Sequence, residues 1–103
     1  MRIGIVGGLD RNARDLEGIA LACGHHLELH TGGLAGAASA AGLRALIGRS
    51  DLVIVLTDVN SHNAVRMARR HARLRHTPLR LLRRLGATQF AAFLRGLHPP
   101  LAA

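Results

Sequence analysis

The sequence contains no lysine, no tryptophan and no tyrosine, and it has a single cysteine, Cys23. One cysteine excludes an internal disulfide and fits a reducing compartment, so we expect a cytoplasmic protein. No stretch approaches the roughly 18 apolar residues that a membrane span needs, so we expect no membrane partner. The apolar run within residues 1–7 is too short for a signal peptide and is better explained as a first strand.

Acidic residues are absent from the second part of the chain. Residues 1–58 hold five arginines and six acidic residues, for a net charge of −1, whereas residues 59–103 hold nine arginines and no acidic residue, for +9. A basic half of this kind attracts nucleic acid, phosphate groups or carboxylates. The codon bias of a GC-rich genome would also enrich arginine and remove lysine, but it explains the missing acidic residues less well.

The absent lysines and aromatics also limit the ways of binding a nucleotide. Without lysine there is no P-loop, and Gly7-Gly8 is not a GxGxxG motif, so these glycines indicate a tight turn more strongly than a phosphate site. Single-strand-binding surfaces usually offer stacking aromatics. Here only Phe90 and Phe93 are available, and their spacing places both on the core face of a helix.

Strand and helix signals alternate along the chain. The apolar patterns predict strands at residues 2–6, 26–30, 51–56 and 78–82, and helices at residues 12–23, around 43–47, at 61–75 and around 90–97. With right-handed crossovers, this order gives an α/β fold: one three-layer domain over residues 1–103 with a four-stranded parallel sheet. We expect the strand order 2-1-3-4, similar to half of a flavodoxin or Rossmann fold.

Three further features have no place in the sheet. Residues 31–42 are rich in Gly and Ala, and we expect a long loop that is mobile or lines a site. Residues 98–103 form a C-terminal tail. Cys23 falls on the apolar stripe of the first helix, which predicts an inert thiol in the core.

The predicted topology brings the ends of all four strands to one rim, where open α/β sheets bind ligands. Polar and glycine residues follow each strand. The candidate binding residues are Gly7, Gly8, Arg11, Thr31, Gly32, Gly33, Thr57, Asp58, Asn60, Ser61, Arg66 and Arg83, and the candidate metal ligands are His30 and His62.

The segment 57–64 is the most informative part of this rim, because it follows the strongest strand signal and opens a helix with capping residues. His62 lies in the first helical turn, where the dipole favours a neutral imidazole that binds metal or acts as a base. Ser61 and His62 are adjacent on a helix, so their side chains point about 100° apart and form no nucleophile–base pair. Capping alone is the competing interpretation of Asp58 and Ser61.

Two histidines, several arginines and Gly/Ala surfaces at one rim suit a haem. Imidazole binds the iron, arginines pair with the propionates, and small residues admit a flat ring. A zinc site needs three or four ligands, which His30, Asp58 and His62 supply only if the rim closes tightly.

A set of motifs spans nearly the whole chain: Ile5-Val6-Gly7-Gly8, His30-Thr31-Gly32-Gly33, Ser50-Asp51-Leu52-Val53, Thr57-Asp58-Val59-Asn60-Ser61-His62-Asn63-Ala64-Val65, Pro78-Leu79-Arg80 and Phe90. This set resembles a bacterial family catalogued as domain of unknown function 2325. The resemblance implies a small, often dimeric α/β protein, with haem binding in some members. Many relatives carry cysteine where this chain has Val59 or Asn60, and lysine where it has Arg69 or Arg70. A ligand that needs that thiolate would not bind here.

Two hypotheses of function follow. The first is a non-enzymatic haem-binding or haem/redox-sensing protein, with His30 or His62 on the iron and Arg11, Arg66 and Arg83 near the propionates. The alternative is a basic regulatory module that binds nucleic acid or an acidic partner through the helix at residues 61–75. We also expect a homodimer, because a domain of this size buries only about two-thirds of its unfolded surface.

Overall fold

The computed structural model describes residues 1–8, 13–33, 37–58 and 60–97. Strands and helices alternate in this part of the chain: β1 (Arg2–Val6), α1 (Ala13–Ala22), β2 (His26–His30), α2 (Ala37–Arg49), β3 (Leu52–Leu56), α3 (His62–Leu74), β4 (Leu79–Leu82) and α4 (Ala87–Arg95). All neighbouring strands pair in parallel, in the order β2-β1-β3-β4. The fold is therefore the flavodoxin-like α/β domain that the sequence predicts.

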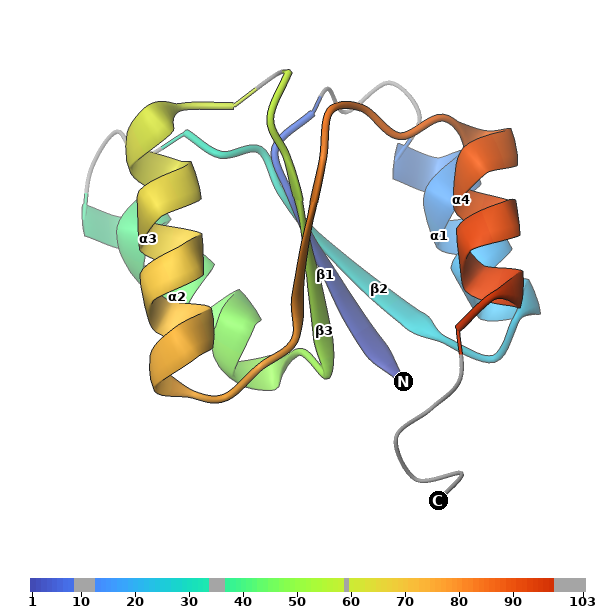
Figure 1. Ribbon diagram of the computed structural model, residues 1–103, viewed down its shortest axis with the longest axis horizontal. Helices are drawn as coiled ribbons and strands as arrows, with labels where there is room; N and C mark the ends of the chain where they lie inside the picture. The colour runs from blue at the N-terminus through green and yellow to red at the C-terminus, as the bar shows by residue number, and fades with distance from the viewer. Residues whose placement is uncertain (9–12, 34–36, 59, 98–103) are drawn as a thin grey trace.

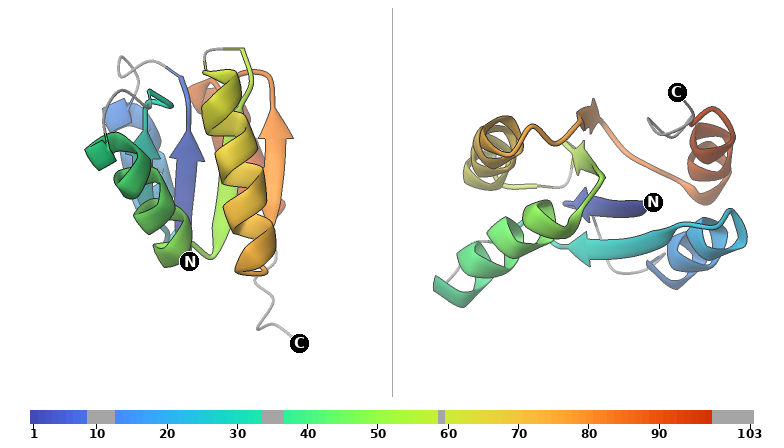
Figure 2. Two further views of the ribbon diagram at one scale, coloured as in Figure 1. Left: turned by 90° about the vertical axis from the view of Figure 1, so that its left-hand side faces the viewer. Right: turned by 90° about the horizontal axis from the view of Figure 1, so that it is seen from below.

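Two helices cover each face of the sheet (Figures 1 and 2). Successive side chains of a strand point to opposite faces, so each strand contributes to two separate cores. Ile3, Ile5 and Ile54 pack toward α1 and α4, whereas Val53 and Val55 pack toward α2 and α3. All five residues of β3 are buried, as expected for a central parallel strand covered on both sides.

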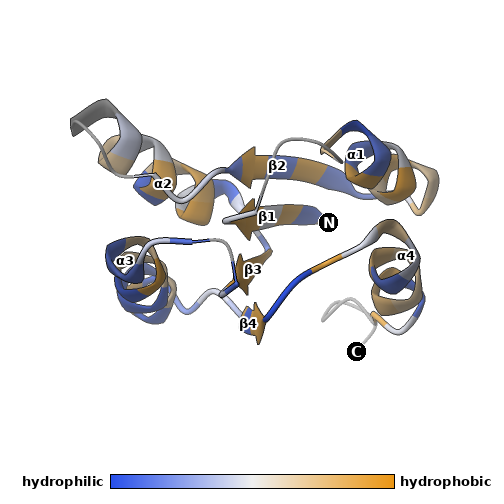
Figure 3. Ribbon diagram, turned by 90° about the horizontal axis from the view of Figure 1, so that it is seen from above, coloured by the Kyte–Doolittle hydropathy of each residue, from blue (hydrophilic) through white to orange (hydrophobic). Residues whose placement is uncertain are grey.

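Small residues bring α2 and α3 close to the sheet. A Cβ atom at Gly4 in β1 would collide with the side chains of Leu46 in α2 and of Ser50, the residue after this helix. The buried stripe of α3 consists of Ala64, Ala68 and Ala72, one turn apart. The outer side of α3 is strongly hydrophilic (Figure 3), because arginines occupy the positions between these alanines.

Helices cover the edge strand β4 less well than they cover β2, the strand at the opposite edge of the sheet. Helix α4 packs beside α1 (Figure 2) rather than over β4. Leu82 is half-buried in consequence, and Leu81 on the opposite side of β4 is 45% exposed. An open space therefore remains between the end of β4 and α4.

The structure differs from the sequence prediction in two segments. Helix α2 begins at Ala37, so the second half of the predicted 31–42 loop is helical; alanine is the best helix former, which outweighs the glycines. Cys23 is exposed, so the prediction of a core thiol is wrong. Helix α1 ends at Ala22, and Cys23 lies in the turn that follows.

Other predictions concern residues outside the described ranges, namely Arg11 and the tail at residues 98–103. Among the helices that the structure describes, none has the length and apolar character needed to cross a membrane.

Candidate functional site

The loops that follow β1, β2 and β3 meet at the carboxyl edge of the sheet, as the sequence predicts. The Gly7 N–H donates to the His30 carbonyl over 2.7 Å, and the Ser61 hydroxyl donates to the Gly32 carbonyl over 2.9 Å. Four of the candidate residues, Gly7, Gly32, Asn60 and Ser61, thus come together at this edge. Their contacts connect the loops to one another.

Asn60 holds the ends of the two central strands together. Its side-chain Nδ2 donates to the Val6 carbonyl over 3.2 Å and to the Leu56 carbonyl over 2.9 Å, and its Oδ1 accepts from the Ser61 N–H. Gly32 has a φ of +88°, and a Cβ atom there would collide with the Asn60 side chain. The Asn60 amide is therefore used by the fold and is not free for a ligand.

Ser61 serves as the N-cap of α3, the role that the competing interpretation gave it. Its hydroxyl oxygen accepts from the Ala64 N–H over 3.1 Å. Thr57 and Thr31 make only longer contacts, at 3.4 Å, with the Leu82 carbonyl and the Gly33 N–H. None of these hydroxyls is hydrogen-bonded to a histidine in the described part of the chain, so the described rim holds no nucleophile–base pair.

Both ring nitrogens of His30 already have partners. The Gly32 N–H donates to Nδ1 over 3.0 Å, which places the ring proton on Nε2, and Nε2 lies 2.9 Å from the Ser39 carbonyl. His30 thus joins the loop after β2 to helix α2. An iron atom could bind His30 only after one of these hydrogen bonds is broken.

His62 is the first residue of α3 and is exposed. Its ring has no hydrogen bond to any residue that the structure describes. The described residues also include no group of three or more His, Cys, Asp or Glu side chains that could hold a metal ion. The predicted zinc alternative therefore has no support within these ranges.

Asp58 pairs with two consecutive arginines at the end of β4. Its carboxylate lies 3.5 Å from Arg83 Nε and 3.3 Å from Arg84 Nε. The backbone explains this register, because the Thr57 N–H donates to the Leu82 carbonyl and the Asp58 N–H donates to the Arg83 carbonyl. Strand pairing of β3 with β4 thus continues past the end of both strands.

A second concave region lies between α2 and α3, away from the rim glycines. This groove has a volume of about 540 Å³ and is lined by Ala40, Arg44, Asn63, Arg66, Met67, Arg70 and His71. Arg66 is among the predicted binding residues, and Arg70 follows it by one helical turn. Arg44 is not among the predicted residues, because only the packing of α2 against α3 brings it to the same groove.

Within the described ranges, no carboxylate pairs with the arginines of the groove, whereas Asp58 pairs with Arg83 and Arg84 at the rim. In the described part of the chain, the ion pairs are Arg49–Glu28 and those of Asp58, and none involves Arg44, Arg66 or Arg70. Burial lowers the pKa of His71 below its ordinary value of 6.5, and the charges of Arg44, Arg70 and Arg75 lower this pKa further. These causes favour the neutral imidazole of His71, and the arginines carry the formal positive charge of the groove.

The comparison with protein families agrees with the resemblance in the sequence motifs. The model of a family described as "Uncharacterized protein conserved in bacteria (DUF2325)" matches residues 2–97. The chain belongs to the DUF2325 family. No curated protein and no solved structure matches this DUF2325 protein significantly.

The motif at residues 57–62 of this DUF2325 protein contains two different kinds of residue. Asn60 and Ser61 make the hydrogen bonds that hold the rim together. The His62 ring is exposed and has no hydrogen bond to the described residues, and Arg66, one turn after the motif, lines the α2–α3 groove. The polar side chains of Asn60 and Ser61 are thus used within the fold, whereas the His62 ring is not.

Proposed function

We propose that this protein binds the phosphate backbone of nucleic acid through the α2–α3 groove. The observation that carries the proposal is the convergence of Arg44, Arg66 and Arg70 on one groove with no carboxylate paired to any of them among the described residues. Unpaired cations in a concave surface attract polyanions over long range. Guanidinium groups also match phosphate geometry, because they donate two parallel hydrogen bonds.

The outer face of α3 extends this basic surface beyond the groove. Arg69 and Arg73 are exposed, like Arg66 and Arg70, on the side away from the buried alanine stripe. Residues four apart on a helix rise by about 6 Å. A row of arginines along α3 can therefore contact several phosphates of one strand.

The composition favours duplex nucleic acid over single strands. Phe90 is fully buried and Phe93 packs against the core on the other side of the sheet, so neither is available for stacking on bases at the groove. Phosphate contacts by themselves carry no sequence information. We therefore expect binding with little sequence preference and a steep dependence on salt.

Fluorescence anisotropy with a labelled DNA duplex tests this proposal at several salt concentrations. For three phosphate contacts, one for each groove arginine, log Kobs should fall with log salt with a slope of about −2.7. Replacing both groove arginines of α3 (Arg66→Gln with Arg70→Gln) should reduce this slope by about 1.8.

The matched control is Arg14→Gln with Arg95→Gln, which removes the same charge from exposed positions on α1 and α4. This control should keep most of the wild-type slope. An equal loss in both double variants would show that net charge alone drives binding. Failure of the wild type to bind heparin at about 0.1 M salt would refute the proposal, because ions are only moderately screened there.

Haem binding stays a second proposal, with His62 rather than His30 as the expected iron ligand. His62 is exposed and without a hydrogen bond in the described ranges, whereas His30 uses both ring nitrogens. Arg66, one turn after His62, is the nearest propionate partner in the sequence. Addition of hemin should then give a Soret band that His62→Ala removes and His30→Ala preserves. A free-hemin spectrum with the wild type would exclude this function.

A further inference from the structure

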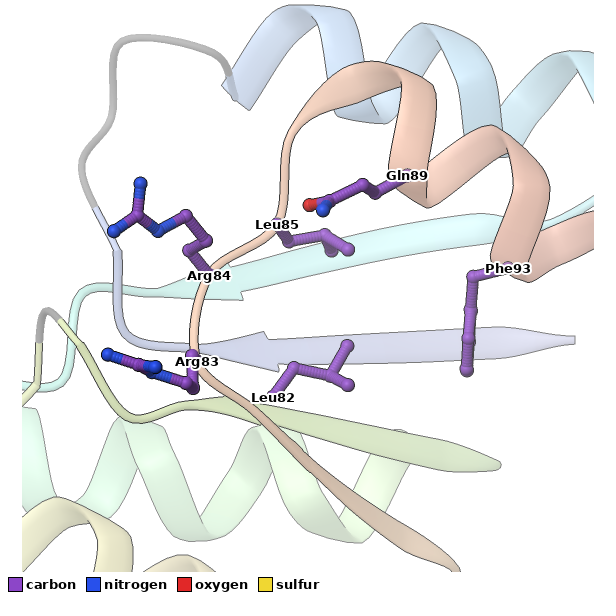
Figure 4. Close-up of a pocket in the computed structure, with 6 residues that line it drawn as sticks. All are labelled: Leu82, Arg83, Arg84, Leu85, Gln89 and Phe93. Atoms are coloured by element: carbon purple, nitrogen blue, oxygen red, sulfur yellow. The ribbon is translucent and has the colours of Figure 1, made fainter.

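A separate cavity lies between the carboxyl end of β4 and helix α4 (Figure 4). Its volume is about 590 Å³, within the range of small-molecule sites. The lining residues are Leu82, Arg83, Arg84, Leu85, Gln89 and Phe93. The cavity exists because α4 packs beside α1 and leaves the end of the edge strand uncovered.

Charged and apolar side chains lie at different ends of this cavity. Figure 4 shows Arg83 and Arg84 extending to one side of the segment that follows β4. Leu82 and Leu85 extend to the other side, toward Gln89 and Phe93 of α4. Leu82 and Phe93 also pack against the core of this face. A ligand that fills the cavity therefore meets an apolar wall at one end and guanidinium groups at the other.

Among the described residues, the charged end has one carboxylate for two guanidinium groups. Asp58 contacts both arginines at Nε, and the side chains of Arg83 and Arg84 are 85% and 79% exposed. Their terminal NH₂ groups have no hydrogen bond to the described residues. The three groups carry a net charge of +1, so one further carboxylate would make the cluster neutral.

We propose that this cavity binds a monoanionic amphiphile, namely a carboxylate attached to an apolar body. The terminal guanidinium NH₂ groups bind the carboxylate, and Leu82, Leu85 and Phe93 contact the apolar part. Gln89 Oε1 accepts from the Gly86 N–H, which leaves its NH₂ group to donate to the ligand. The site is on the α1/α4 side of the sheet and does not use the α2–α3 groove, so it is independent of nucleic-acid binding.

Titration with the fluorescent probe 8-anilinonaphthalene-1-sulfonate, followed by displacement, tests this site in the intact chain. The protein has no tryptophan or tyrosine, so the emission comes from the probe. Octanoate should displace the probe, whereas acetate and 1-octanol, which each lack one half of the proposed ligand, should be about tenfold weaker or worse. Displacement by octanol as efficient as by octanoate would overturn the proposal, and so would equal displacement by acetate.

Variants locate the site. Arg83→Gln with Arg84→Gln should weaken probe binding about tenfold or more, because hydrogen bonds to a charged group are lost. The groove variant Arg66→Gln with Arg70→Gln should bind the probe like the wild type. Unchanged binding in the folded Arg83/Arg84 variant would refute the proposal. Should that variant not fold, amide chemical shifts of the wild type with octanoate decide: changes must concentrate in residues 82–93, and changes elsewhere refute the site.

Discussion

The rim of the sheet and the groove between α2 and α3 use their polar side chains in different ways. At the rim, Asn60 donates to carbonyl groups at the ends of β1 and β3, and Ser61 donates to a carbonyl of the loop after β2. In the groove, Arg44, Arg66 and Arg70 have no ion pair with any residue of the described ranges. A dense group of polar side chains at a strand end can thus stabilise the fold itself, because backbone groups at the end of a sheet need hydrogen-bond partners.

Removal of the Asn60 amide should have the largest effect of the changes considered for the two regions. Asn60→Ala leaves the Val6 and Leu56 carbonyls without this donor, and we expect a loss of about 2–3 kcal/mol in the free energy of unfolding. Urea denaturation followed by circular dichroism measures it. Asn63→Ala is the matched control, because Asn63 is exposed in the first turn of α3 and should cost less than about 0.5 kcal/mol. Equal losses would contradict the structural role of Asn60.

Removal of a groove charge should instead affect binding and leave stability nearly unchanged. For Arg44→Gln we expect the salt slope of DNA binding to decrease by about 1. The control on the same helix is Arg49→Gln, since Arg49 is paired with Glu28 at 2.7 Å. This control should keep the slope and have little effect on stability, as for an exposed ion pair. An equal decrease of the slope in both variants would show that Arg44 contributes only its charge to DNA binding and not its position on the α2 side of the groove.

A change of pH should have a smaller effect than the substitutions above. It should change the affinity for DNA and the free energy of unfolding in opposite directions. The pKa of His71 is lowered in the folded state by burial and by Arg44, Arg70 and Arg75, so below pH 6.5 the unfolded chain binds more protons. The unfolding free energy therefore decreases as the pH falls below 6.5. A bound phosphate reverses this balance, because it favours the protonated imidazole, so DNA should bind more tightly at pH 5.5 than at pH 7.5.

His71→Gln should reduce both pH effects, while the other histidines remain as an internal control. Calorimetric unfolding between pH 5.5 and pH 7.5 measures the change in stability. Fluorescence anisotropy over the same range measures the change in DNA binding. An unchanged pH profile of DNA binding in His71→Gln would show that His71 does not face the bound phosphates.

The smallest expected effect concerns the oligomeric state, for which a homodimer stays a prediction. Exposed Leu21 and Leu74, at 65% each, and the open edge of β4 offer apolar area for a second copy. Light scattering at micromolar concentration should then give about twice the 11.0 kDa mass of the chain. A monomer that still binds DNA would show that the groove is complete within one chain.

The sequence predicted the sheet well, because strand order follows from local patterns. The buried run 52–56 and the alternating strands are readable in one dimension, and right-handed crossovers leave few topologies. The bounds of the helices were predicted less well, because local sequence patterns do not show where a helix begins or ends. Helix α2 begins inside a Gly/Ala segment, and Cys23 follows the apolar stripe of α1 but lies beyond the end of that helix.

The candidate site shows the same limit at the level of side chains. The order of the strands along the chain suffices to predict that His30, Asn60 and Ser61 lie at one edge of the sheet, since parallel strands end together. That their hydrogen bonds are used within the fold is visible only in three dimensions. The same holds for Arg44 and Arg70, which are 26 positions apart and line one groove with no carboxylate among its described lining residues. Whether a polar group is available to a ligand depends on its neighbours in space, and helix packing brings these neighbours together from distant parts of the chain.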